Sequence, residues 1–587
     1  MVKSKGEQIK IKINNKNISI KEGSSVLESA LEQGFDIPHF CNHPDLPVEG
    51  SCRACLIEVV DKKRGNFVTT SCTLRAKEGL EILLDTKEVS NLRKKNMELL
   101  FAGHKEKCPK CQNKYPCKTA EIMKKYGVTG KEFEKDICLG GCEIHKMTDA
   151  AEFDSSLCID CNLCVKRCHE IGVDFLKLEG TGSKRRITYN KDPKVDCIYC
   201  GQCTTVCPVS AIREQNQIKE VIDVLKDKDK IVIVQTAPSV RASIGEEFGM
   251  GFGVNCEKKL NTAYRMLGFD KVFDVNFGAD ITTYIEAEEL IERFQHNEVM
   301  GIGHKLPMFT SCCPGWVKAA EFYFPELLNN LTTSRSPQIH SGAAYKTWWA
   351  EKEGIDPKKI VVVSIMPCTS KKYEAKMDEL NIGDLRPVDY VLTTREVAVL
   401  MKIKNIDFAN LEDSEADKYA EYSGAAAIYG ASGGVMESAL RTAYKSITGE
   451  DLKHFELKQV RAGLEGIKTA KIDVKGTEVR VAVAATLANM RIIIDEIKEN
   501  PEAYHYVEFM ACGGGCIGGG GQPNPSSKKI IAQRTSALYK IDDKKKIRTA
   551  HGNPVLQEFL KWIEEKNDKE LSDSLFYRGF EKKEKFE

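Results

Sequence analysis

Five cysteines in three patches of the C-terminal half could carry the chemistry of this chain. They lie in the segments TSCCPGW (310–316), MPC (366–368) and MACGGGC (510–516). Four thiolates gathered from separate loops can hold an iron–sulfur cluster. A fifth thiol that is not needed as a ligand is free to move protons. The three patches therefore predict a cluster site with a spare thiol beside it.

Eight further cysteines form two runs with the spacing C-x2-C-x2-C-x3-C. They are Cys158, Cys161, Cys164 and Cys168, then Cys197, Cys200, Cys203 and Cys207. In two-cluster ferredoxins with this spacing, the fourth cysteine of each run ligates the cluster of the other run. A tetrahedral zinc ion has no use for such crossed pairing. The spacing therefore predicts two [4Fe–4S] clusters.

Two blocks nearer the N-terminus are less specific. The first is Cys41, Cys52, Cys55 and Cys72, and the second is His104, Cys108, Cys111 and Cys117. Read alone, either block fits a four-coordinate zinc site as well as an iron–sulfur cluster. Cys138, Cys142 and Cys256 fit no block, and they are either idle buried thiols or, for Cys138 and Cys142, a redox-active dithiol.

Composition narrows the class of protein. The 587 residues include 86 Lys and Arg against 85 Asp and Glu, so nucleic acid is an unexpected partner. No apolar signal region opens the chain, and no apolar stretch is long enough to span a bilayer. We therefore expect a cytoplasmic protein of three to five domains whose 23 cysteines bind metal and do not form disulfides.

The elements around the cysteines can be predicted from periodicity. Alternation over residues 9–20 predicts a hairpin around Asn14 and Asn15, followed by a helix with a capping box at Ser25 and Glu28 and an end at Gly34. β-branched runs precede the special loops at 231–234, 360–365 and 506–510, and helical patterns cover 285–294 and 396–402.

This alternation predicts an α/β domain with a parallel sheet, whose ligands collect at the carboxyl ends of the strands. Gly518–Gly521 is followed by no Walker lysine, so nucleotide binding is not expected. We interpret these glycines as positions where the backbone approaches a bulky cluster.

From about residue 5 to 570 the chain resembles the iron-only (FeFe) hydrogenases. The resemblance implies a multidomain α+β and α/β protein. It divides into a β-grasp [2Fe–2S] ferredoxin-like domain (1–85), a [4Fe–4S] module held by one histidine and three cysteines (86–125) and a linker (126–150). These precede a bacterial 2[4Fe–4S] ferredoxin-like domain (151–225) and an α/β catalytic domain (226–587) that ends in a small-subunit-like segment.

The resemblance also assigns the residues of the catalytic site. Cys313, Cys368, Cys512 and Cys516 would hold a [4Fe–4S] subcluster, and Cys516 would bridge it to a di-iron unit with carbonyl, cyanide and dithiolate ligands. Ser239 and Lys371 would donate hydrogen bonds to the cyanides. The remaining pocket residues would be Ala237, Pro238, Ser336, Pro337, Gln338, Met366, Tyr429 and Met510.

A proton path is implied in the same way. It would run from Cys312 through Glu286, Thr332 and Glu289 to Arg293 at the surface. Glu286, Glu289 and Arg293 are spaced to share one helix face, which without the resemblance is typical of a solvated ion-pair face. Burial is expected to raise the pKa of both carboxyl groups toward the working pH.

The implied activity is the reversible reaction of two protons and two electrons to hydrogen, with four accessory clusters as the electron wire. Ferredoxin or flavodoxin would supply electrons to a monomeric enzyme, and maturation proteins would build the di-iron unit. The alternative is a non-catalytic redox sensor, or a relative that handles iron–sulfur clusters without the di-iron unit. An electron-transfer subunit like that of complex I would account for the first 220 residues only.

Overall fold

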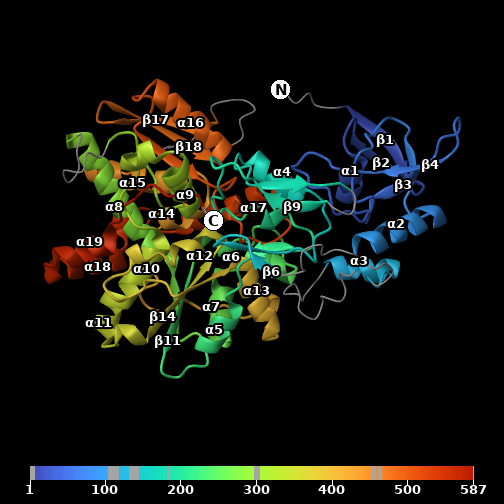
Figure 1. Ribbon diagram of the computed structural model, residues 1–587. Helices are drawn as coiled ribbons and strands as arrows, with labels where there is room; N and C mark the ends of the chain where they lie inside the picture. The colour runs from blue at the N-terminus through green and yellow to red at the C-terminus, as the bar shows by residue number, and fades with distance from the viewer. Residues whose placement is uncertain are drawn as a thin grey trace.

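The computed structural model describes residues 7–102, 118–130, 144–181, 185–296, 305–452, 458–459 and 466–585. Figure 1 shows the N-terminal sheet projecting at one side of the molecule and the sheets of the C-terminal half gathered at the other. Across the described ranges, every helix is too short or too polar to cross a bilayer.

The N-terminal hairpin forms as predicted. β1 (Gln8–Ile13) and β2 (Lys16–Lys21) are antiparallel, and Asn14 and Asn15 between them have positive φ angles of 44° and 66°. Two asparagines with positive φ make the type I′ turn that suits a two-residue hairpin. The strands join a five-stranded sheet in the order β2-β1-β5-β3-β4, with β3 (Leu56–Val59), β4 (Phe67–Thr70) and β5 (Glu81–Leu83).

Helix α1 (Val26–Glu32) covers this sheet, and Val26, Leu27 and Ala30 are buried against its isoleucines. Ser25 is the N-cap and Gly34 follows the helix with φ 81°, but the predicted capping box is wrong. The Ser25 hydroxyl donates instead to the carbonyl of Cys72 at 3.4 Å, because the cysteine loop packs over the start of the helix.

The middle of the chain forms two small sheets. β6 (Ile144–Lys146), β7 (Ala151–Asp154) and β10 (Ile212–Glu214) make one, in the order β10-β7-β6, and β8 (Leu176–Glu179) pairs with β9 (Arg186–Tyr189) in the other. The helices of this region are α2 (Lys87–Leu100), α3 (Lys118–Tyr126), α4 (Leu163–Glu170) and α5 (Ile218–Val224).

The C-terminal half contains the predicted parallel sheet, but the three special loops come from two sheets. β11 (Ile231–Thr236), β12 (Lys271–Asp274), β14 (Ile360–Met366) and β15 (Tyr390–Thr393) form an all-parallel sheet in the order β12-β11-β14-β15. The second sheet has the order β13-β19-β18-β17-β16, with β13 (Met308–Phe309), β16 (Lys458–Gln459), β17 (Ile467–Val474), β18 (Thr477–Ala485) and β19 (Tyr506–Met510). The MPC loop thus follows a strand of the first sheet, and the CGGGC loop follows a strand of the second.

Helices surround both sheets of this half (Figure 1). They include α6 (Pro238–Arg241), α7 (Glu257–Leu267), α8 (Val275–His296), α9 (Pro314–Tyr323), α10 (Pro337–Ala344), α11 (Ala350–Glu353), α12 (Ser370–Glu374), α13 (Thr394–Ile403), α14 (Gly424–Ala427), α15 (Gly434–Thr448), α16 (Leu487–Glu499), α17 (Lys528–Lys544), α18 (Pro554–Lys566) and α19 (Lys569–Phe576). One apolar cluster continues from Phe40 through the cysteine runs to Trp316 and Phe509, whereas the N-terminal sheet and the all-parallel sheet have apolar clusters of their own.

Candidate functional site

The four cysteines of the first block converge on one loop. The Sγ atoms of Cys41 and Cys52 are 3.3 Å apart, and all four side chains are buried. A hydrogen bond with Cys52 lowers the pKa of Cys41 to about 5, and one with Cys72 lowers the pKa of Cys55 to about 6. The same bonds raise the pKa values of Cys52 and Cys72, so each pair of thiols shares one proton, which a bound metal would displace.

The two long cysteine runs are crossed as predicted. Cys158, Cys161 and Cys164 of the first run line one cavity together with Cys207, the last cysteine of the second run. Conversely, Cys168 lies close enough to Cys197 and Cys203 to contribute to the raised pKa of each thiol, in which burial is the main cause. The fold therefore builds two sites of four cysteines each. The His104 block, Cys138 and Cys142 lie outside the described residues.

A cavity in the C-terminal half collects most of the predicted pocket. Prolines at the first position of α6, α9 and α10 form part of its wall, where a residue without an N–H leaves no donor unsatisfied. The cavity is lined by Ala237, Pro238, Ser239, Val275, Ala279, Cys312, Cys313, Pro314, Pro337, Gln338, Met366, Pro367, Cys368, Lys371, Tyr429, Gly430, Met510 and Cys516.

Two predicted pocket residues are not in this lining. Cys512 is buried just behind it, near enough to Cys368 and Cys313 that their charges raise its pKa further, after burial as the main cause. Ser336 is turned away, because its hydroxyl donates to Glu374 Oε2 at 2.8 Å.

Glu374 also accepts hydrogen bonds from Gln338 Nε2 at 2.7 Å and Lys371 Nζ at 2.8 Å. This buried carboxylate is a site residue that sequence reasoning missed. Its position three residues after Lys371 on α12 was the available signal.

The cavity offers hydrogen-bond donors that suit an anionic ligand. Ser239 is fully buried, and its hydroxyl has no partner among the residues that the structure describes. The ammonium of Lys371 donates to the carbonyl of Cys312 at 3.0 Å and to Glu374, which leaves one of its three N–H groups for a ligand. Together with the four cysteines, these donors fit a cluster that carries cyanide ligands.

Two glycines of the predicted run, Gly519 and Gly520, lie against neighbouring backbone. A Cβ atom at Gly519 would lie 2.2 Å from the carbonyl of Pro367, and one at Gly520 would lie 2.5 Å from that of Cys200. These glycines therefore bring the loop against neighbouring backbone from the MPC loop and the second cysteine run.

The predicted proton-path residues lie together on and beside α8. Thr332 Oγ1 donates to Glu289 Oε2 at 2.6 Å, and the Thr333 amide donates to the same atom at 2.9 Å. Burial raises the pKa of Glu286 to about 8, as expected for a relay group. Among the described residues, no direct hydrogen bond joins Glu286 to Cys312 or to Thr332.

Arg293 is buried and does not reach the surface, so its predicted place at the outer end of the path is wrong. Its guanidinium forms an ion pair with Glu289 and donates to the carbonyls of Lys305 at 2.9 Å and Leu331 at 2.7 Å. These carbonyls are 12 and 38 residues further along the chain, in the stretch that follows the helix.

Tyr506 is a second residue that sequence reasoning missed. Its hydroxyl donates to Glu286 Oε2 at 3.1 Å from the start of β19, and both side chains are fully buried. The pattern of the strand predicted a buried residue at this position but not its partner.

Known protein families match both halves of the chain. A domain described as "Iron only hydrogenase large subunit, C-terminal domain" matches residues 230–520. A "2Fe-2S iron-sulfur cluster binding domain" matches 6–87, a "4Fe-4S dicluster domain" matches 157–211, and an "Iron hydrogenase small subunit" matches 528–573. The match over 6–87 favours the iron–sulfur interpretation of the first cysteine block over zinc.

Relatives cover nearly the whole chain. The NADP-reducing hydrogenase subunit HndD of Solidesulfovibrio fructosivorans is 37% identical over 98% of this chain and 99% of its own length. Iron hydrogenase 1 of Clostridium pasteurianum is 39% identical over 93% of this chain and 95% of its own. The solved structure of an apo FeFe-hydrogenase variant from Chlamydomonas reinhardtii is 36% identical, covers 62% of this chain and 98% of its own, and gives a TM-score of 0.55. The chain therefore belongs to the iron-only hydrogenases.

Proposed function

We propose that the protein interconverts hydrogen with two protons and two electrons, at a [4Fe–4S] cluster joined to a di-iron unit. The observation that carries the proposal is the cavity itself. It places a buried spare thiol, Cys312, beside the cysteine ligands, and it presents Ser239 and Lys371 as donors. A protein without the di-iron unit has no need for these three groups.

The residues of the cavity would have three roles: to hold the cluster, to orient the di-iron unit and to exclude water. Cys313, Cys368, Cys512 and Cys516 would hold the cluster, and Ser239 and Lys371 would orient the di-iron unit through its cyanides. When bound, the di-iron unit would supply the metal site at which hydrogen is formed or split. The apolar wall of prolines and methionines would exclude water.

Protons would pass between this cavity and the outside through Cys312, Glu286, Thr332 and Glu289. Burial raises the pKa of the Cys312 thiol well above its ordinary value, so the thiol is protonated at rest. A water molecule would bridge each gap where the side chains do not touch. Because Arg293 is buried, its part in the path would be to hold the carboxylate of Glu289 in place.

Electrons would reach the cavity through four accessory clusters: one [2Fe–2S] and three [4Fe–4S], the first of these at His104, Cys108, Cys111 and Cys117. We propose a reduced ferredoxin or flavodoxin as their source, for a monomeric cytoplasmic enzyme matured by other proteins. The NADP-reducing relative supports a second candidate, a partner subunit that exchanges electrons with NADP. Hydrogen evolution driven by reduced ferredoxin alone would separate the two sources.

An infrared spectrum of the chain matured together with the di-iron assembly proteins tests the proposed function. Metal-bound carbonyl and cyanide absorb where protein does not, so their bands should appear together with hydrogen evolution. Full cluster content without these bands and without hydrogen would instead support the redox sensor or cluster-handling alternative. Cys313→Ala is the control, because removal of a ligand should abolish the bands.

A further inference from the structure

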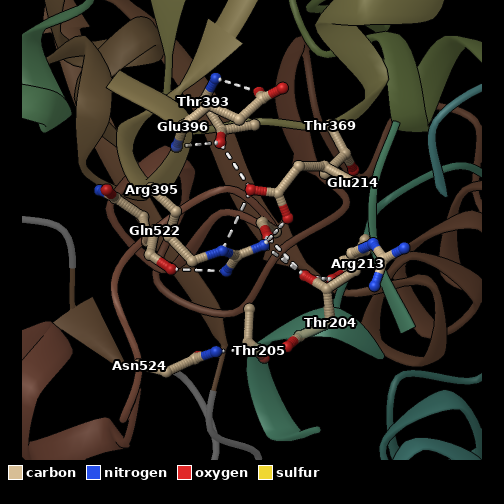
Figure 2. A network of polar contacts seen from close by, with 12 residues as sticks. Thr204, Thr205, Arg213, Glu214, Thr369, Thr393, Arg395, Glu396, Gln522 and Asn524 are labelled. Atoms are coloured by element: carbon tan, nitrogen blue, oxygen red, sulfur yellow. Dashed lines mark hydrogen bonds and ion pairs between the residues drawn. The ribbon is translucent and has the colours of Figure 1, made fainter. Parts of the chain in front are cut away.

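A buried ion pair joins the two-cluster module to the C-terminal domain (Figure 2). Glu214 ends β10, and Arg395 lies in the first turn of α13, 181 residues later. Arg395 Nη2 is 2.5 Å from Glu214 Oε2, and the two side chains are only 15% and 8% exposed. With so little water to replace a lost partner, each charge depends on the other.

The guanidinium of Arg395 also holds two loops that carry cluster ligands. Its Nη2 donates to Thr204 Oγ1 at 2.8 Å and to the carbonyl of Gly520 at 2.8 Å. Thr204 directly follows the accessory ligand Cys203, and Gly520 lies four residues after Cys516. The hydroxyl of Thr204 donates in turn to the carbonyl of Gly520 at 2.7 Å. Figure 2 shows Arg395 at the centre of these contacts.

The same accessory loop is held on its other side by the residues after Cys368. The hydroxyls of Thr369 and Ser370 donate to the carbonyl of Tyr199 at 2.9 Å and 2.7 Å. Gln202 Nε2 donates to the carbonyl of Gly518 at 2.8 Å. The loop from Cys197 to Cys203 therefore forms hydrogen bonds with two loops of the catalytic site, the one after Cys368 and the one after Cys516.

At these contacts the loops of the two cluster sites touch. Cys512 Sγ lies 3.9 Å from the carbonyl oxygen of Cys200. A Cβ atom at Gly520 would lie 2.5 Å from that same oxygen, so the loops leave no space between them. Because the rate of electron tunnelling falls steeply with distance, the separation of these loops would affect the last electron step.

We propose that Arg395 and Glu214 are positioning residues for electron transfer between the accessory cluster of Cys197, Cys200, Cys203 and Cys168 and the catalytic centre. The proposal rests on the function proposed above. In the step concerned, an electron leaves the reduced accessory cluster and enters the catalytic centre, and no bond forms or breaks. The pair acts by holding the loops together and does not touch either set of ligands.

The pair is separate from the proton chemistry. Neither Arg395 nor Glu214 belongs to the described lining of the catalytic cavity, and neither contacts the residues of the proton path. Weakening the pair should therefore slow electron delivery and leave proton and hydrogen exchange at the catalytic centre intact.

Arg395→Gln in the matured full-length chain tests the proposal with two assays. The first measures hydrogen evolution driven by reduced ferredoxin, the electron donor proposed above for the accessory clusters. The second measures isotope exchange between hydrogen and heavy water, which requires no net electron delivery. We expect evolution to fall about tenfold relative to exchange, with iron content and infrared bands as in the parent. Glu214→Gln should give the same change in the ratio.

Arg441→Gln is the matched control. Arg441 and Asp542 form a similarly buried ion pair, 12% and 1% exposed, between α15 and α17, away from the cluster loops. This variant should lose stability without changing the ratio of evolution to exchange. An unchanged ratio in Arg395→Gln with full iron content would overturn the proposal, as would an equal change in Arg441→Gln.

Thr204→Val decides the matter if Arg395→Gln does not fold. It removes the hydroxyl that joins Arg395 to Gly520 and keeps the size of the side chain. A lowered ratio supports the proposal, and an unchanged ratio overturns it. A parent enzyme that shows neither evolution nor exchange would overturn the hydrogenase function itself, which distinguishes the two failures.

Discussion

Cys312 and Cys313 are neighbours in the chain, but we propose different roles for them: Cys312 carries a proton and Cys313 is a cluster ligand. If Cys312 carries the first proton and ligates nothing, Cys312→Ala should assemble the catalytic centre with its infrared bands. Its hydrogen evolution should fall by about two to four decades, which is the usual contribution of a positioned acid–base group. The measurement is the evolution rate at matched cluster content. Evolution near the parent rate would remove Cys312 from the mechanism.

Tyr506 moderates the proton affinity of Glu286 through one hydrogen bond. The groups that act on this carboxyl are Tyr506, Glu289, Glu508, the backbone of Ser311, Tyr429 and Cys312. Burial raises its pKa to about 8, and the bond from Tyr506 opposes that rise. In Tyr506→Phe the pKa should increase further, so the loss of hydrogen evolution at high pH should move to higher pH. A pH–rate profile identical to that of the parent would contradict this role.

The raised pKa of Glu286 also makes the stability of the fold depend on pH. Its usual value is 4.5, so between that pH and about 8 the folded chain keeps a proton that the unfolded chain releases. This group therefore opposes folding increasingly as pH rises through that window. Glu286→Gln should remove the dependence, which thermal unfolding at several pH values can measure.

Thr332 and Thr333 provide a matched pair for the hydroxyl of the path. Both hydroxyls donate to Glu289 Oε2, at 2.6 Å and 3.1 Å. Thr332→Ser should be nearly silent, whereas Thr332→Val should slow hydrogen evolution by one decade or more, as expected for loss of a relay group. Thr333→Val is the control and should leave the rate close to that of the parent. Equal losses in the two valine variants would mean that the bonds only fix Glu289.

At the scale of the element, α8 carries Glu286 and Glu289 on a buried face, and Arg293 lies on the same face. The guanidinium joins the helix to the carbonyls of residues 305 and 331 and neutralises Glu289. Arg293→Met should destabilise the fold by about 3–5 kcal/mol, because it leaves a buried charge without its partner. A fall in the thermal midpoint measures this effect.

Arg265→Met on α7 is the control for that prediction. Its ion pair with Asp417 is 38% and 28% exposed, and an exposed pair contributes about 1 kcal/mol or less. Similar midpoints for the two variants would show that Arg293 is not the partner on which Glu289 depends.

At the scale of the whole molecule, one apolar cluster connects the first cysteine loop, the two long cysteine runs and the loops of Trp316 and Cys512. The proposed set of one [2Fe–2S], three accessory [4Fe–4S] and one six-iron centre corresponds to about 20 iron atoms per matured chain. Metal analysis checks this number. Zinc at the His104 block, with iron reduced to about 16 atoms per chain, would mean that this module does not transfer electrons.

The sequence by itself determined the class of site and most of the residues that line it. Cysteine spacing within a loop sets which sulfurs can reach one cluster, and the crossed pairing of Cys164 and Cys207 follows from such local geometry. The hairpin at Asn14 and the parallel strands before the special loops were predictable for the same reason. They depend on short-range periodicity and turn chemistry.

Only the tertiary structure decided which polar groups are buried and with whom they pair. The periodicity of α8 allowed a solvated face, and the segment that buries Arg293 is brought over it by the fold. Ser336 donates a hydrogen bond to Glu374, and Tyr506 donates one to Glu286, which is 220 residues away in the chain. Arg395 and Glu214 are likewise distant in the chain. Such pairs depend on how sheets and loops are stacked, which no local pattern of residues encodes, because burial is a property of the assembled core.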